Sequence, residues 1–188
     1  MQVAAFIAIS LDGFIARPDG GLDWLNPFHD EEHGYGAFFA GVDAVVIGRG
    51  TYDTVLGFPA WPYGEKRVIV CTHRPGRPVH GEELWAGPPR ALVDRLEGEG
   101  VRRIYVDGGA LIRGFLQERL VDELTINVIP LVLGSGRPLF TSGLPEVSLQ
   151  LLESRSFPSG KVQLRYRVTS GRRAARSEPP PPRAGRPG

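Results

Sequence analysis

The sequence has one cysteine, Cys71, among its 188 residues. A single thiol can form neither a disulfide within the chain nor a zinc site built from several cysteines. Cys71 ends the apolar run VIVC, a position typical of a small buried side chain. We therefore expect Cys71 to be part of the core.

A long apolar run is also missing. No stretch approaches the roughly 20 apolar residues that a membrane-spanning helix needs. The N-terminal residues, MQVAAFIAISLDG, have no basic segment ahead of their apolar part, as an export signal would have. We expect a cytoplasmic protein without a membrane partner.

An excess of charge of one sign is absent as well, with 22 Lys and Arg against 21 Asp and Glu. The last 19 residues carry five Arg and one Glu, which leaves a net charge of −3 on the first 169. A domain with that charge gives no reason to expect nucleic acid as a partner. We predict one domain over residues 1–169 and a disordered Arg/Pro-rich tail over residues 170–188, where no large apolar side chain could pack.

Short β-rich apolar runs alternate with helical segments between residues 2 and 169, which is typical of a largely parallel sheet covered by helices. The final two strands should form an antiparallel hairpin around Pro158-Ser159-Gly160. The expected strands are residues 3–10, 44–47, 67–71, 103–106, 123–129, 148–157 and 162–169. The expected helices are residues 30–40, a helix that begins at residue 50 or 51, and residues 88–99 and 110–118.

Three polar clusters rich in Gly or Arg follow predicted strands, where an open parallel sheet binds its ligands. Glycine lets the backbone approach a ligand, and arginine can pair with a phosphate. Each cluster alone is equally typical of a structural turn, but three together favour one extended polyphosphate ligand such as a dinucleotide. The usual G-x-G-x-x-G fingerprint is absent. The clusters are Gly48-Arg49-Gly50-Thr51, Thr72-His73-Arg74 and Asp107-Gly108-Gly109-Ala110.

The segment HDEEH, residues 29–33, has two histidines at the spacing that zinc proteases use on one helix face. Asp30 stands where such a motif needs Glu, and the glycines at positions 34 and 36 shorten the helix. No third ligand follows from the spacing, so we expect no metal site. The acids either donate a proton to a substrate or complement the helix dipole.

Several segments, in this order, resemble the dihydrofolate reductase superfamily: SLDGFIA, DWLNPFHD, VVIGRGTYDTV, KRVIVCT and RIYVDGGALI. The SLDG opening and PLVLGSGRPLF, residues 130–140, are more similar to the reductase domain of riboflavin biosynthesis and its stand-alone relatives. The resemblance covers residues 3–169. It implies a three-layer α/β fold with a mostly parallel central sheet, and NADPH as the cofactor.

The resemblance also implies where NADPH lies. Arg49 and Thr51 would contact its phosphates, Thr72 and Arg74 the adenosine ribose and its 2′-phosphate. The first strand end and the SLDG loop would line the nicotinamide. The expected cofactor contacts are Ala8, Gly13, Gly48, Arg49, Gly50, Thr51, Thr72, Arg74, Asp107, Gly108, Gly109, Ala110 and Leu111.

Dihydrofolate reductases carry an acid after a Trp-containing segment, and Asp30 after Trp24 is similar to that arrangement. Asp30 is therefore the first choice for protonating a substrate nitrogen, with Glu31 and Glu32 as alternatives. Asp12, in the SLDG loop, is the other predicted catalytic residue. Nearby apolar side chains would raise the pKa of such a carboxyl by desolvation, which suits a proton donor.

The expected function is an NADPH-dependent reductase that transfers a hydride to a small heterocyclic substrate of the pyrimidine or pterin type. One alternative is the riboflavin-pathway reduction of a phosphoribosylaminouracil. An alternative of another class is a nucleotide-binding module without turnover. A homodimer is suggested by the resemblance and by the C-terminal hairpin, whose alternation in VQLRYRV leaves one apolar face available.

Overall fold

The computed structural model describes residues 1–28 and 31–170 of the chain. Two predictions lie outside these residues. One is the catalytic role of Asp30, and the other is the disordered tail, of which only Ser170 is described.

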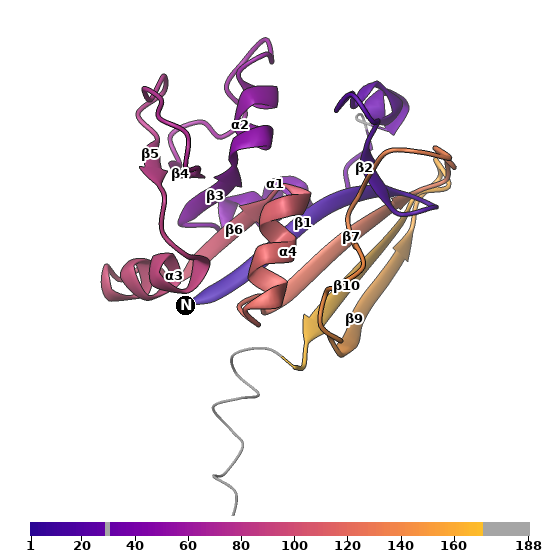
Figure 1. Ribbon diagram of the computed structural model, residues 1–188. Coiled ribbons are helices and arrows are strands. Elements are labelled where there is room, and N and C mark those ends of the chain that lie inside the picture. Colours follow the sequence, from indigo (N-terminus) through magenta and orange to yellow (C-terminus); the bar gives the residue numbers. More distant parts are fainter. Residues whose placement is uncertain (29–30, 171–188) are drawn as a thin grey trace, which may run out of the picture.

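An eight-stranded sheet forms the centre of the protein, in the order β5-β4-β3-β6-β1-β7-β10-β9 (Figure 1). Within it, β10 is antiparallel to β7 and β9, and the other pairings are parallel. The predicted α/β fold with an antiparallel C-terminal hairpin is confirmed. The strands are β1 (Gln2–Ser10), β3 (Ala44–Gly48), β4 (Arg67–Cys71), β5 (Glu83–Trp85), β6 (Arg103–Asp107), β7 (Glu123–Ile129), β9 (Leu149–Ser156) and β10 (Val162–Val168).

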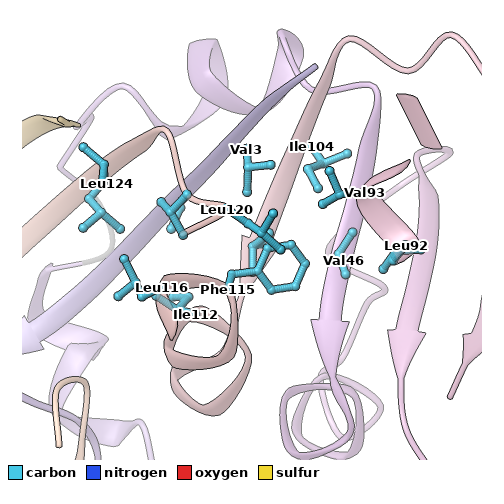
Figure 2. Packing of buried hydrophobic residues seen from close by; sticks show 14 of the residues in the cluster. Val3, Val46, Leu92, Val93, Ile104, Ile112, Phe115, Leu116, Leu120 and Leu124 are labelled. Atoms are coloured by element: carbon cyan, nitrogen blue, oxygen red, sulfur yellow. The ribbon is translucent and has the colours of Figure 1, made fainter. Parts of the chain in front are cut away.

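Helices cover both faces of this sheet. Successive side chains of a buried strand point to opposite faces, so both faces are apolar and need covering. In β1, Val3 belongs to the core that α3 and α4 cover, and Phe6 to the core under α1 and α2. Figure 2 shows the first core, where Phe115 of α4 lies among strand side chains such as Ile104. The helices are α1 (Tyr35–Ala40), α2 (Arg49–Val55), α3 (Pro89–Gly98) and α4 (Gly109–Gln117), with a 3₁₀ helix, η1 (Asp23–Phe28). Within the described residues, none of these helices is long and apolar enough to cross a bilayer.

The predicted helix over residues 30–40 begins later than expected, at Tyr35. Gly34 precedes it with φ of 80°, a left-handed conformation that cannot continue a right-handed helix. Residues 31–33 are consequently irregular, and the idea that HDEEH presents one helix face is wrong for this part of the segment.

Three very short strands were not predicted from the sequence. β5 pairs with β4 at the sheet edge, and β2 (Phe14–Ala16) pairs with β8 (Arg137–Pro138) in a separate two-stranded sheet. Strands of two or three residues carry no recognisable alternation, so their existence depends on the neighbour that they pair with.

Candidate functional site

The loops after β3, β4 and β6 lie together because these strands are parallel neighbours. Gly48 pairs with Cys71, and Ile47 with Asp107, so the three strands end at the same edge of the sheet. The loops also pack closely: a Cβ on Gly108 would collide with the hydroxyl of Thr51. Gly108 has φ of 97°, which only glycine adopts readily.

Two predicted phosphate contacts are brought onto neighbouring loops. Arg49 begins α2 and donates from Nε to Asp53 at 2.7 Å, which leaves its terminal nitrogens available. Nη1 of Arg49 reaches across to the next loop, 3.5 Å from where a Cβ on Gly76 would stand. That loop carries the exposed Arg74, whose N–H donates to the hydroxyl of Thr72 at 3.0 Å. The edge of the sheet is therefore basic here.

Glycines keep this edge open. Gly50 is exposed, and a Cβ there would meet no atom within 4 Å, whereas a Cβ on Gly48 would contact Leu111 at 3.7 Å. Gly109 is buried, and a Cβ there would collide with the side chain of Ile15. Ala110 is exposed on the first turn of α4. Several predicted cofactor contacts thus surround one open edge.

Asp107 ends β6 and is half-buried, with its carboxyl group hydrogen-bonded to the protein. It accepts the N–H of Gly108 at 2.8 Å and the hydroxyl of Tyr63 at 3.3 Å. Burial raises the pKa of Asp107, because the charged form loses its solvation there. The side chain holds the turn into α4 in place.

Asp12, the predicted catalytic residue of the SLDG loop, accepts three hydrogen bonds. The donors are the hydroxyl of Ser10 at 2.6 Å and the backbone N–H groups of Leu133 at 3.1 Å and Gly134 at 2.7 Å. These bonds, that of Ser10 foremost, lower the pKa of Asp12. The carboxylate ties the SLDG loop to the connector of residues 130–140, and the adjacent Gly13 accepts the N–H of Leu139 at 2.9 Å.

A pocket of about 160 Å³ lies on the α1 face of the sheet, beside the predicted nicotinamide contact Ala8. Most of its lining is apolar or aromatic, and the ring of Phe6 packs edge-on against Tyr35 at 5.3 Å. The lining residues are Phe6, Ile7, Ala8, Leu25, Phe28, His33, Tyr35, Asn127, Ile129 and Lys161.

Lys161 and Asn127 were not predicted from the sequence as site residues. A lysine beside the hairpin turn is ordinarily solvent-exposed, so its sequence position gives no signal. Asn127 did give one, since it is a polar residue within the buried strand ELTINVI. Both side chains are buried in the structure.

Glu31, one of the candidate proton donors, contacts the C-terminal hairpin. It accepts the hydroxyl of Ser159 at 2.5 Å and lies 3.3 Å from Nζ of Lys161. The bond from Ser159 is the main reason that the pKa of Glu31 is lowered. Because the carboxyl group of Glu31 stays ionised, its negative charge can balance the positive charge of Lys161. Glu32 instead accepts the N–H of Gly34 at 2.6 Å.

Metal ligation has no support in residues 1–28 and 31–170, where no three His, Cys, Asp or Glu side chains gather. Cys71 is half-buried, and burial raises the pKa of its thiol to about 12. The thiol is therefore a poor nucleophile.

Comparisons with known proteins place these features in a family. Residues 1–163 match the RibD C-terminal domain. The uncharacterized protein YwjB of Bacillus subtilis is 42% identical over 170 residues, covering 88% of this chain and 97% of YwjB. The riboflavin biosynthesis protein RibD of Corynebacterium ammoniagenes is 31% identical over 163 residues, covering 72% of this chain and 44% of RibD.

Solved structures agree. A Shewanella sp. PV-4 protein, linked by its description to riboflavin biosynthesis, superimposes with a TM-score of 0.83 and 35% identity, covering 89% of this chain and 99% of its own. A Thermotoga maritima deaminase/reductase shares the fold, with a TM-score of 0.68 and 17% identity over 89% of this chain and 56% of its own.

Proposed function

The chain belongs to the RibD C-terminal domain family, a family of riboflavin-pathway reductases, and from this we propose that it is an NADPH-dependent reductase. Its substrate would be a small heterocycle of the pyrimidine or pterin type, reduced by hydride transfer. The observation that carries the proposal is the gathering of three strand-end loops at one edge of a sheet whose strand β1 also carries a pocket beside Ala8.

The residues at the sheet edge fit NADPH. Arg49 and Arg74 supply guanidinium groups on adjacent loops, suited to phosphates. Gly50 leaves its backbone open to a ligand, and the hydroxyl of Thr51 lies beside Gly108. When bound, NADPH would supply the hydride, and the chain would supply position and electrostatics.

The pocket would hold the substrate ring. Ala8 offers a small side chain where the nicotinamide and the substrate would meet, and the surrounding aromatic residues would shield a bound ring from water. Burial raises the pKa of the Tyr35 hydroxyl to about 12, so at neutral pH this side chain is a neutral hydrogen-bond donor. The proton would come from the acidic segment of residues 30–32, with Asp30 as the first choice.

A narrower version of the proposal is reduction of 5-amino-6-(5-phosphoribosylamino)uracil, the reaction named for the Thermotoga maritima protein. Membership of the RibD C-terminal domain family favours it. This substrate therefore belongs in the first activity assay, together with dihydrofolate.

The decisive experiment is calorimetric titration of NADPH and NADH into wild type, Arg49→Ala and the control Arg90→Ala. Arg90 bonds Glu118 beyond the far end of α4. We expect Arg49→Ala to weaken NADPH binding about 10-fold or more, the usual value of a charged hydrogen bond, and Arg90→Ala to bind like wild type. A wild-type protein that binds neither nucleotide contradicts the proposal. Binding of NADPH without turnover of any substrate would favour the nucleotide-binding module.

A further inference from the structure

His33 supplies an imidazole ring to the wall of the pocket. Imidazole is the side chain that ordinarily gains and loses a proton near neutral pH. The other titratable groups of the lining, within the described residues, are Tyr35 and Lys161. Burial raises the pKa of Tyr35 to about 12, and Lys161 is paired with Glu31 at 3.3 Å. Glu31 and Glu32 do not line the pocket, so His33 is the side chain that the segment of residues 31–33 presents there.

One ring nitrogen of His33 is held by the backbone. Nδ1 lies 2.8 Å from the carbonyl oxygen of Glu31. A carbonyl oxygen only accepts hydrogen bonds, so Nδ1 carries a hydrogen and donates it. Nε2 is then the basic nitrogen of the neutral ring, and the hydrogen on Nε2 is the one that leaves the charged ring. Among residues 1–28 and 31–170 no partner occupies Nε2, which leaves this nitrogen for a molecule in the pocket.

The position of His33 is fixed from two sides. The side-chain amide of Gln163, in β10, donates to the carbonyl oxygen of His33 at 2.7 Å and to Oδ1 of Asn127 at 2.9 Å. On the other side, the centre of the His33 ring lies 5.6 Å from that of Phe6 in β1. Phe6 and Ala8 stand two residues apart in β1 and both line the pocket, so the imidazole lies on the face where the nicotinamide is expected. A general acid needs such a defined place relative to the reacting atoms.

We propose that His33 is a catalytic residue that donates a proton from Nε2 to a nitrogen of the substrate. The proposal rests on the proposed reductase function for the hydride. When a hydride adds to the carbon of a C=N bond, the nitrogen needs a proton: the Nε2–H bond breaks, an N–H bond forms on the substrate, and neutral imidazole remains with its hydrogen on Nδ1. The ring is half-buried, so solvent can return the proton. This donor differs from Asp30, whose choice rests on the resemblance alone.

The first test is the tautomer of His33, which needs neither cofactor nor substrate. Nitrogen NMR of protein with isotope-labelled histidine, at alkaline pH where imidazole is ordinarily neutral, reports which ring nitrogen carries the hydrogen. We expect the hydrogen of His33 on Nδ1. The sequence has four histidines, so the signal is assigned by its loss in His33→Gln. A hydrogen on Nε2 overturns the proposal, because the basic nitrogen would then face the carbonyl of Glu31.

The second test is NADPH-dependent turnover of dihydrofolate and of 5-amino-6-(5-phosphoribosylamino)uracil. His33→Gln should lower kcat about 100-fold or more, as loss of a general acid does, and leave NADPH binding unchanged. Added imidazole should restore part of the turnover of His33→Ala, which a purely structural role of the ring would not allow. His80→Gln is the matched control, because the ring of His80 stacks on Trp61 at 4.3 Å and does not line this pocket.

The outcomes separate His33 from the reductase function. Turnover by His33→Gln equal to that of wild type overturns the proposal, and a loss confined to Asp30→Asn gives the proton to Asp30. A hydrogen on Nδ1 of His33 in a protein that binds no NADPH keeps His33 as the acid–base group of the pocket and sinks the reductase function. NADPH binding with the hydrogen of His33 on Nε2 does the reverse.

Discussion

Gly108 lies so close to the hydroxyl of Thr51 that no Cβ fits between them. This contact joins the loop after β6 to the first turn of α2, and it holds two of the three strand-end loops in one arrangement. The proposed cofactor edge is thus set by packing between loops that are far apart in the sequence.

Gly108→Ala should destabilise the protein by about 1–3 kcal/mol and abolish tight NADPH binding, because the new Cβ meets Thr51 and the φ of 97° strains alanine. Urea unfolding and NADPH titration measure the two effects. Gly98→Ala is the control: its Cβ would meet nothing within 4 Å at the end of α3, so stability should stay equal or rise slightly. A Gly108→Ala protein as stable as wild type would show that the loops move apart freely.

Asp107→Asn should make stability less dependent on pH. Burial raises the pKa of Asp107 in the folded protein above its ordinary value of 3.8, so the folded state holds this proton more tightly than the unfolded state. The cost of this carboxyl to stability therefore grows as pH rises from about 4 through its raised pKa, and is constant above that pKa. Urea unfolding between pH 4 and 8 should show the free energy of unfolding of the variant rising relative to that of wild type as pH rises. A constant difference over that range would show that the pKa of Asp107 is not raised in the folded protein.

Asp12→Asn should loosen the connector of residues 130–140, because the carboxylate accepts the N–H groups of Leu133 and Gly134. Amide hydrogen exchange at these two residues should be faster than in wild type, and NADPH-dependent turnover should fall with it. Loss of turnover with unchanged exchange would instead indicate that Asp12 acts directly on the substrate.

Arg74→Ala should discriminate between the two nicotinamide cofactors. If Arg74 contacts the 2′-phosphate, its loss weakens NADPH binding about 10-fold and leaves NADH binding unchanged. The neighbouring His73→Ala serves as the control for general disturbance of the exposed loop after β4. Equal weakening of both nucleotides would place Arg74 at a phosphate that they share.

The strands of the central sheet were predictable because apolar runs such as VVI and IYV have the length and composition of buried strands. The strand-end clusters followed from the same pattern, since a parallel sheet places its strand ends at one edge. The start of α1 was missed because the effect of Gly34 depends on its backbone conformation. Lys161 was missed because burial of a lysine is decided by contacts with Glu31, 130 positions earlier in the chain.

The bonds from Gln163 to His33 and from Ser159 to Glu31 join opposite ends of the polypeptide. During synthesis, every residue of the proposed cofactor edge has emerged by position 111, whereas one wall of the pocket comes from the last hairpin. A chain synthesised as far as residue 111 therefore contains every proposed cofactor contact but lacks the hairpin side of the pocket.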